Sequence, residues 1–268
     1  TISMASDMAV CEDNAPIDIA SVVSPAGGTW TYTGPGLTGT IFNPATAGPG
    51  TYIFTYSYGS GSCSVQEDFT IQVNGLPDLS ISAETLVCEQ VSCLTLSASP
   101  LGGFWTSDNG GVVLGNCFDA SSSGVGIFTL TYNYTDGNGC SNTEDLSIEV
   151  YSIPQLIIPD TFYCDANAAY SLPTPNFTGG TWSGPGVTDP NGSFNPSLAG
   201  GTGTYVLNYA FADPLGCSND VDINVIVNPV PVVNLGADID LCIDAVALDL
   251  NSIASPTGGT YFGQGVIG

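Results

Sequence analysis

Hydrophobic and polar residues alternate in three long stretches of the chain. Residues 50–58, 126–134 and 203–211 place an aromatic residue or Leu at every second position, with mostly small or polar residues between them. Each stretch is followed by a turn and a second alternating run, which begins near Phe69, Leu146 or Val221. A period of two is typical of a strand with one buried face, so each pair of runs predicts a β-hairpin.

Shorter alternations precede these hairpins and predict a further strand in each copy. They are Ile17 and Ile19, then Leu94 and Leu96, and finally Val246, Leu248 and Leu250. No convincing amphipathic helix is found, and 34 Gly and 18 Pro favour strands and turns. About seven short strands per copy fit a small antiparallel sandwich. The predicted fold class is therefore all-β: tandem Ig-like antiparallel β-sandwich domains in a beads-on-a-string array.

A Gly-Gly-aromatic motif marks the copies. It occurs as GGTW at 27–30, GGFW at 102–105, GGTW at 179–182 and GGTY at 258–261, a period of about 77 residues. We predict Ig-like repeats at 1–76, 77–153 and 154–230 and a partial repeat at 231–268. The fourth copy stops shortly after its motif, so we expect a longer parent protein. Pro-bearing links between copies favour semi-rigid spacing.

The tryptophan of the motif has two interpretations. We expect Trp30, Trp105 and Trp182 to enter the sandwich cores, as an Ig-type core tryptophan packs near a disulfide, with the glycines permitting a turn or bulge. The alternative is a ligand platform built on the three exposed rings. In GPG, Pro sets the backbone angle and Gly accepts positive φ, which predicts a tight turn.

Nine cysteines keep step with the repeat. Each complete copy has one Cys before its motif and one after its aromatic strand, about 52 residues apart, and we predict that these pair within the copy. Copy two carries two additional cysteines that we also pair, and Cys242 is left unpaired in this segment. The predicted bonds are Cys11–Cys63, Cys88–Cys140, Cys93–Cys117 and Cys164–Cys217.

Disulfides place the chain in an oxidising, extracytoplasmic compartment. Each would stabilise a repeat by about 3 to 4 kcal/mol in the chain-entropy model, which matters for cores this small. The alternative use of cysteine is zinc, but no CxxC pair occurs, and the CEQVSC segment at 88–93 is a poor match to structural zinc spacing.

The chain contains no Lys, Arg or His, against 25 Asp plus Glu. Nucleic-acid binding is therefore not expected, because no side chain can neutralise a phosphate. Histidine bases, Schiff-base lysines and Ser-His-Asp triads are impossible. Nothing singles out a carboxylate pair for glycoside hydrolysis, so we predict no enzyme activity. Because the carboxylates repel one another, we expect stability to depend on salt.

Acidic residues cluster after the cysteines. One set follows the second Cys of each copy (Glu67, Asp68, Glu144, Asp145, Asp220 and Asp222) and another follows the first (Glu12, Asp13, Glu89 and Asp165). We interpret them as solvated surface acids and predict no cofactor. The alternative is Ca²⁺ or another divalent ion, although EF-hand spacing is absent. No apolar run has the roughly 18 residues of a membrane span, and no signal peptide is visible.

The segments GGTWSGPGV, FNPSLAG, GTYVLNYAF and GCSND, at 179–220, carry a family resemblance. Together with their counterparts in copy one, they resemble the Ig-like and PKD-like repeats of giant secreted surface proteins of Bacteroidota, including the SprB-type gliding adhesins. Copy two departs most, with DNGG in place of GPG and FDASSSG in place of FNPATAG. The resemblance implies type IX secretion and display on the cell surface or in an extracellular fibre.

Two classes of function follow. The first is a structural or adhesive repeat segment of a large extracellular surface protein, which spaces and presents an adhesive part. The alternatives are glycan- or protein-binding Ig-like modules, or a filament subunit that self-assembles by strand exchange. The expected partners are other repeats of the same chain, surface glycans, or like chains in a fibre.

Overall fold

The computed structural model describes residues 1–165 and 168–267. The chain divides into two compact units, Thr1–Ser152 and Ile153–Gly268. Unit 1 contains two separate hydrophobic cores and unit 2 contains one, and each core draws its residues from a single predicted repeat. Gly268, the end of the fourth predicted repeat, lies outside the described residues.

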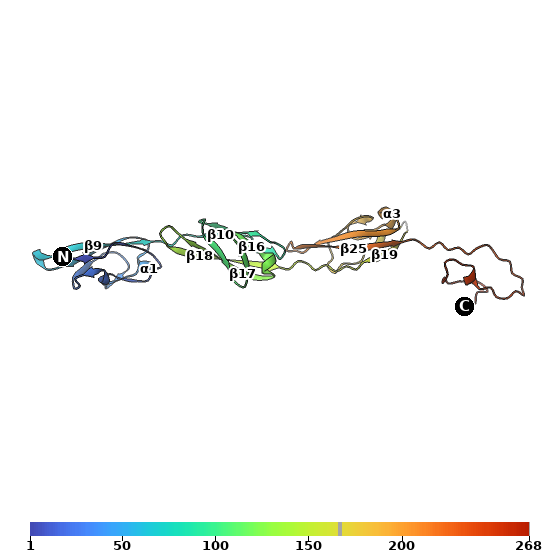
Figure 1. The fold of residues 1–268 in the computed structure, drawn as a ribbon, viewed down its shortest axis with the longest axis horizontal. Coiled ribbons are helices and arrows are strands. Elements are labelled where there is room, and N and C mark those ends of the chain that lie inside the picture. The colour runs from blue at the N-terminus through green and yellow to red at the C-terminus, as the bar shows by residue number, and fades with distance from the viewer. Residues whose placement is uncertain (166–167, 268) are drawn as a thin grey trace. The chain divides into compact units, whose positions relative to one another are not determined.

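The first repeat begins unit 1 (blue in Figure 1). Its strands and helices are β1 (Ser3–Met4), β2 (Met8–Cys11), β3 (Ile17–Asp18), the 3-10 helix η1 (Ile19–Val22), β4 (Val23–Ser24), β5 (Thr29–Thr31), β6 (Leu37–Thr38), β7 (Ile41–Phe42), α1 (Pro44–Ala47), β8 (Gly50–Tyr58), the 3-10 helix η2 (Gly61–Cys63) and β9 (Val65–Asn74).

The second repeat completes unit 1. Its elements are β10 (Ser80–Ser82), β11 (Leu86–Cys88), β12 (Leu94–Thr95), β13 (Ser97–Ser99), β14 (Phe104–Ser107), β15 (Val112–Leu114), β16 (Cys117–Asp119), α2 (Ala120–Ser123), β17 (Gly126–Thr135) and β18 (Ser141–Tyr151).

The third repeat contains the strands of unit 2. Its elements are β19 (Thr161–Cys164), β20 (Tyr170–Ser171), β21 (Thr181–Ser183), β22 (Val187–Asp189), β23 (Ser193–Phe194), α3 (Pro196–Ala199), β24 (Gly203–Ala212) and β25 (Ser218–Asn228), and the 3-10 helix η3 (Leu250–Ser252) follows.

Each of the three repeats contains one four-stranded and one three-stranded sheet, and the first two repeats add the two-stranded sheets β1-β4 and β10-β13. The four-stranded sheets have the orders β2-β9-β8-β5, β11-β18-β17-β14 and β19-β25-β24-β21, and the three-stranded sheets are β3-β7-β6, β12-β16-β15 and β20-β23-β22. The all-β, Ig-like sandwich class is therefore confirmed. The prediction of purely antiparallel sheets is wrong in one respect. In each four-stranded sheet, the strand that comes first in the sequence pairs in parallel with the strand that comes last in the sequence, as β2 does with β9.

The predicted hairpins are the centre of each sandwich. β8 pairs with β9 over nine residue pairs, and β17–β18 and β24–β25 pair over ten each. The alternation predicted from sequence holds: Phe54, Phe69 and Ile71 are fully buried, whereas Ile53, between them in register, is 55% exposed. The buried face of the long hairpin contributes residues to the core of each of these repeats.

The FNP segment ends a strand and begins a one-turn helix. In the first repeat, the Asn43 side chain accepts hydrogen bonds from the backbone N–H groups of Ala45 and Thr46, and Pro44 occupies the first helical position. Asn195 and Asp119 cap the equivalent helices. The last glycine of GPG packs against this helix: Gly36 has φ +89°, and a Cβ there would lie 2.7 Å from the Ala47 Cβ. Turn and helix therefore depend on each other.

The Gly-Gly-Trp motif accommodates a buried tyrosine from the hairpin. In the third repeat, Tyr209 is 2% exposed, and its hydroxyl accepts a hydrogen bond from Gly180 N at 2.8 Å and donates one to Phe177 O at 2.8 Å. Any Cβ on Gly180 would overlap the Tyr209 ring and a carbonyl oxygen, while Gly179 adopts φ +99°. Tyr56 and Tyr132 make the same pair of bonds.

The tryptophans belong to the cores. Trp105 and Trp182 are 7% and 4% exposed, Trp30 is partly buried, and each ring packs on its repeat's clamping tyrosine with centroids 4.9 to 5.1 Å apart. The partner of the tryptophan is therefore a tyrosine and not a cystine as in the Ig comparison. The ligand-platform alternative is not compatible with two buried rings.

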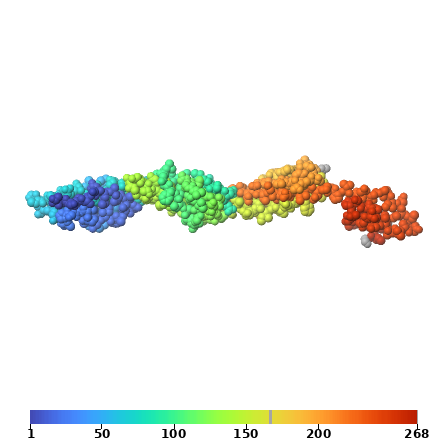
Figure 2. Space-filling view, in the orientation of Figure 1, coloured from blue at the N-terminus to red at the C-terminus, as the bar shows by residue number. Residues whose placement is uncertain are grey.

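The strand predicted at Val246–Leu250 is absent from the described residues. This region contains η3 and a single bridge between Asn234 and Ser255. In the other repeats the corresponding strand pairs with the strand of the FNP segment, as β3 does with β7, and residues 229–267 contain no such segment. Figure 2 shows openings between the segments of this last part of the chain (red).

We expect Tyr209→Phe to destabilise the third repeat by about 1 to 2 kcal/mol, because Gly180 N and Phe177 O lose a common partner. Amides of β24 should then exchange with deuterium about five- to thirty-fold faster in mass spectrometry of the intact chain. Tyr205→Phe is the matched control, since its hydroxyl makes one bond, to Gly201 O. Unchanged exchange in Tyr209→Phe would contradict the clamp.

Candidate functional site: a disulfide between two repeats

A disulfide joins the first repeat to the second. Cys11, the last residue of β2, is bonded to Cys140, which immediately precedes β18, and their Cα atoms are 5.5 Å apart. The two residues are 129 apart in sequence. That Cα distance is normal for a disulfide.

The predicted pairing within repeats is therefore wrong for three bonds. Cys11–Cys63 and Cys88–Cys140 are excluded by Cys11–Cys140 itself. Cys164–Cys217 is excluded because Cys164 is a free, exposed thiol, whereas Cys217 is disulfide-bonded, as is Cys88. Cys63 and Cys242 are also free and exposed. The Cys93–Cys117 bond is present as predicted, within the second repeat.

The length of the hairpin explains why the cysteines of one repeat do not pair. In the parallel register of β2 and β9, Cys11 lies opposite Asn74, the last residue of β9. Cys63 precedes the first residue of β9 by two positions. Ten residues at about 3.3 Å each separate these ends by about 30 Å. A disulfide requires Cα atoms within about 7 Å, so the bond cannot form in the folded repeat.

An Asp turn presents Cys140. The backbone N–H groups of Cys140 and Asn138 donate to Asp136 Oδ1 at 2.8 and 2.9 Å, and Asp136 N donates to Cys140 O at 2.9 Å. The Cys140 N–H in particular holds the pKa of Asp136 below its ordinary value. Asp213 forms the same turn with Cys217. The turn fixes the backbone at the tip of the hairpin, and Cys140 is fully buried.

The link between repeats is bonded on both sides of the disulfide. Glu12, the residue after Cys11, donates its N–H to Asn74 O at 2.9 Å. On the other side, Asn142 in β18 donates its side-chain amide to Pro77 O at 3.0 Å. The link leaving β9 and the hairpin of the second repeat thus meet at one place in unit 1. One disulfide joins the two repeats, and on each side of it a backbone carbonyl near the link accepts a hydrogen bond within its own repeat.

The acidic clusters make hydrogen bonds across strands. Asp68 and Asp145 accept from Thr55 and Thr131 at 2.7 Å, and Asp220 and Asp222 accept from Asn208. Within residues 1–165 and 168–267, no group of three or more His, Cys, Asp or Glu side chains is placed to hold a metal ion. Calcium dependence stays an alternative prediction without a defined site.

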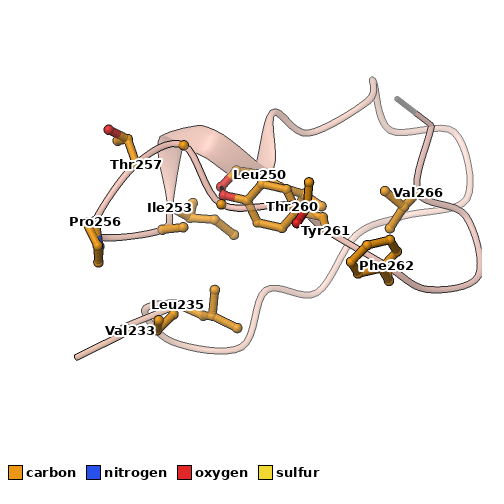
Figure 3. A pocket seen from close by; sticks show the side chains of 13 residues that line it. Val233, Leu235, Leu250, Ile253, Pro256, Thr257, Thr260, Tyr261, Phe262 and Val266 are labelled. Carbon is orange, nitrogen blue, oxygen red and sulfur yellow. Dashed lines mark hydrogen bonds between the residues drawn. The ribbon is translucent and has the colours of Figure 1, made fainter. Parts of the chain in front are cut away.

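An apolar cavity of about 690 Å³ lies in the partial fourth repeat. Val233 and Leu235 lie across the opening from Leu250 and Ile253, with Phe262 beside it (Figure 3). In the second and third repeats, the residues equivalent to Val233 and Leu235 pack against cores that include residues of the long hairpin. None of the residues that line the cavity is charged, so it offers a surface for packing and no converging chemistry.

Comparisons with known proteins give weak similarities. No family model and no curated protein matches the chain. Among solved structures, it is similar to the N-terminal eight Ig domains of Down Syndrome Cell Adhesion Molecule (15% identity, 85% of this chain, 36% of that chain, TM-score 0.40). It is also similar to an I-band fragment of titin (11%, 86% and 98%, 0.36) and to a Ca²⁺-stabilized adhesin of an Antarctic bacterium (13%, 69% and 60%, 0.34).

The chain thus spans about a third of the first of these structures, and the TM-scores decide nothing about function. Across the described part of the chain, no helix has the length and apolar character needed to span a membrane. The functional argument rests on the junction itself.

We expect three thiols per chain, at Cys63, Cys164 and Cys242, to react with a maleimide after denaturation without reductant. Pairing within repeats would leave only Cys242 reactive. A reduced sample, in which all nine cysteines react, calibrates the measurement by mass spectrometry. One labelled site instead of three would contradict the bond between repeats.

We expect an NMR titration to give Asp136 a pKa below its ordinary 3.8, because the Cys140 N–H favours the charged form. A lowered folded pKa means that this contribution to stability is fully present above the unfolded pKa and is lost as pH falls through the folded pKa. The Cys140 amide resonance should follow the same titration. In Asp136→Asn, that resonance should lose its pH dependence; an unchanged titration would contradict the turn.

Proposed function

We propose that this chain is a spacer segment of an extracellular surface protein, built to keep its length under tension. The observation that carries the proposal is the Cys11–Cys140 bond between successive repeats. A disulfide within a repeat stabilises only that repeat. A bond between repeats carries force directly from one sandwich to the next.

The bond takes most of unit 1 out of the force path. Tension applied along the chain passes from Cys11 through the two sulfur atoms to Cys140, so the 129-residue stretch between them carries no load. The link at Pro77 and the carbonyl of Asn74 lie inside this loop, whereas Asn142 lies just beyond it in β18. Unfolding of those parts of either core that lie inside the loop therefore adds little length to the chain.

Surface chemistry supports a spacer over an enzyme. The fully buried side chains are hydrophobic throughout the described residues, and the acids are spread over the outside. Same-sign charge keeps neighbouring molecules apart and the protein soluble. The proposal requires no cofactor, no nucleic acid and no catalytic group.

The disulfides support the proposed extracellular location, because disulfides persist in oxidising compartments. The resemblance to Bacteroidota surface repeats supports the finer proposal: export by a type IX route and display at the cell surface, in a protein of the gliding-adhesin type. The proposed partners are other repeats of the same protein, with adhesion carried by the array or by another part of it.

A second candidate is a binding module for a glycan or a like chain. It is favoured by large apolar side chains left on the surface, such as Phe104 at 63% and Phe162 at 76% exposure. Specific retention on a glycan array that Phe162→Ser abolishes would favour this function, whereas a pure spacer binds nothing specifically.

Pulling on single molecules by their ends tests the spacer. We expect the oxidised chain to be shorter at full extension than the reduced chain by at least about 430 Å, the contour of the 129 residues at about 3.3 Å each. Cys63→Ser is the matched control: Cys63 is a free thiol, so the oxidised variant should keep the length of the oxidised chain. A gain of about 170 Å in this variant, the length of a loop of about 52 residues, would contradict the proposal.

A further inference from the structure

The first cysteine of each repeat occupies one structural position. Cys11, Cys88 and Cys164 each end a strand that runs parallel to the last strand of the same sheet. In all three repeats the next residue donates its N–H to the final residue of that last strand, at 2.8 to 2.9 Å: Glu12 to Asn74, Glu89 to Tyr151 and Asp165 to Asn228. We call these three the strand-end cysteines.

The second cysteine of each repeat also has one position. Cys63, Cys140 and Cys217 lie in the turn of the long hairpin, just before its second strand. We call them the hairpin-tip cysteines. Cys140 and Cys217 are held by the same Asp turn and are 0% and 1% exposed, and both are in disulfides. Cys63 is exposed and free.

We propose that the bond of Cys11 to Cys140 belongs to a series that continues at two of the three free cysteines. The free strand-end Cys164 bonds the hairpin-tip cysteine of a following copy. The free hairpin-tip Cys63 bonds the strand-end cysteine of a preceding copy.

The partner is identified by the junction already formed. Cys164 presents the same strand end as Cys11, with the same backbone bond beside it. What Cys11 receives is a cysteine at the tip of a hairpin, fixed by an Asp turn and buried once bonded. The partner that fits Cys164 is therefore the hairpin-tip cysteine of a second copy of this repeat.

The bond forms by thiol–disulfide exchange with a disulfide-bearing oxidant. One cysteine thiolate attacks a sulfur of the oxidant and gives a mixed disulfide and one thiol of the oxidant. The partner cysteine then attacks the mixed disulfide and releases the second thiol. Two cysteine thiols are oxidised, and one disulfide of the oxidant is reduced to two thiols, which receive the two protons.

The test completes the fourth repeat of the full chain. Residues 258–268 align with residues 179–189 through the shared motif, so a copy of residues 190–228 is joined after Gly268. The extension brings a hairpin-tip cysteine equivalent to Cys217. It also brings a copy of the long hairpin. The protein is oxidised in a glutathione buffer, quenched in acid and digested with pepsin, because the absence of Lys and Arg rules out trypsin.

We expect a peptide pair that joins Cys164 to the appended cysteine, with Cys242 left as a free thiol. A bond between the appended cysteine and Cys242 would restore pairing within the repeat and overturn the series. A free Cys164 would overturn it equally. The control is the same extension with its cysteine changed to Ser, in which Cys164 should remain free.

Oxidation of the unextended chain at high protein concentration keeps the inference testable should the added hairpin fail to fold. We expect dimers in which the strand-end Cys164 of one molecule is linked to the hairpin-tip Cys63 of another, and a peptide map without this pair would overturn the series. Size-exclusion chromatography under non-reducing conditions separates the two sources of the partner copy. A monomer carrying the Cys164 bond places both repeats in one polypeptide, and a dimer with the same peptide pair places them in two. Peptide mapping detects disulfide bonds and does not measure mechanical behaviour. The outcome for this inference is therefore independent of the outcome for the spacer function.

Discussion

In each four-stranded sheet, the strands that come first and last in the sequence pair in parallel, and this pairing determines which cysteines can form disulfides. This pairing sets Cys11 beside Asn74, at the end of the hairpin where the link to the next repeat departs. The other cysteine of the repeat lies at the hairpin turn, a full strand length away. Each sandwich therefore has one strand-end and one hairpin-tip cysteine at opposite ends, and the second repeat also carries the Cys93–Cys117 bond within itself. Bonds between repeats follow from this geometry, as do the backbone contacts around the junction.

Within each sandwich, a second arrangement holds the hairpin against the other strands. A buried tyrosine from the hairpin bonds two backbone groups of the Gly-Gly turn and packs on the following tryptophan. The glycines are needed because a side chain there would overlap the tyrosine ring. The motif that marks the repeat in sequence is thus a packing device. By holding the hairpin in the sandwich, the motif helps to fix the positions of the strand-end and hairpin-tip cysteines.

The fold could be predicted from local patterns, but the junction could not. Alternation along residues 50–58 and its two counterparts identified the hairpins, and their buried faces are those predicted. The one-turn helix that begins at Pro44 was not predicted, because its four residues are too few to show a helical periodicity. The cysteine pairs failed for a different reason. Equal spacing shows that Cys11 and Cys88 are equivalent positions, but equivalence says nothing about contact. Two-residue strands such as β3 and β6 and the parallel register of β2 are set by tertiary packing, and that register decides where Cys11 lies.

The junction also imposes an order of events on biosynthesis. Cys63 leaves the ribosome or the export channel before Cys140 does, and in an unfolded chain it is the nearer partner of Cys11. Only the folded first sandwich holds those two sulfurs a strand length apart. Cys11 therefore either stays a thiol until the hairpin of the second repeat has formed, or forms an early bond that is exchanged as the first repeat folds. Without that exchange, a chain oxidised too early would keep closed, separate loops.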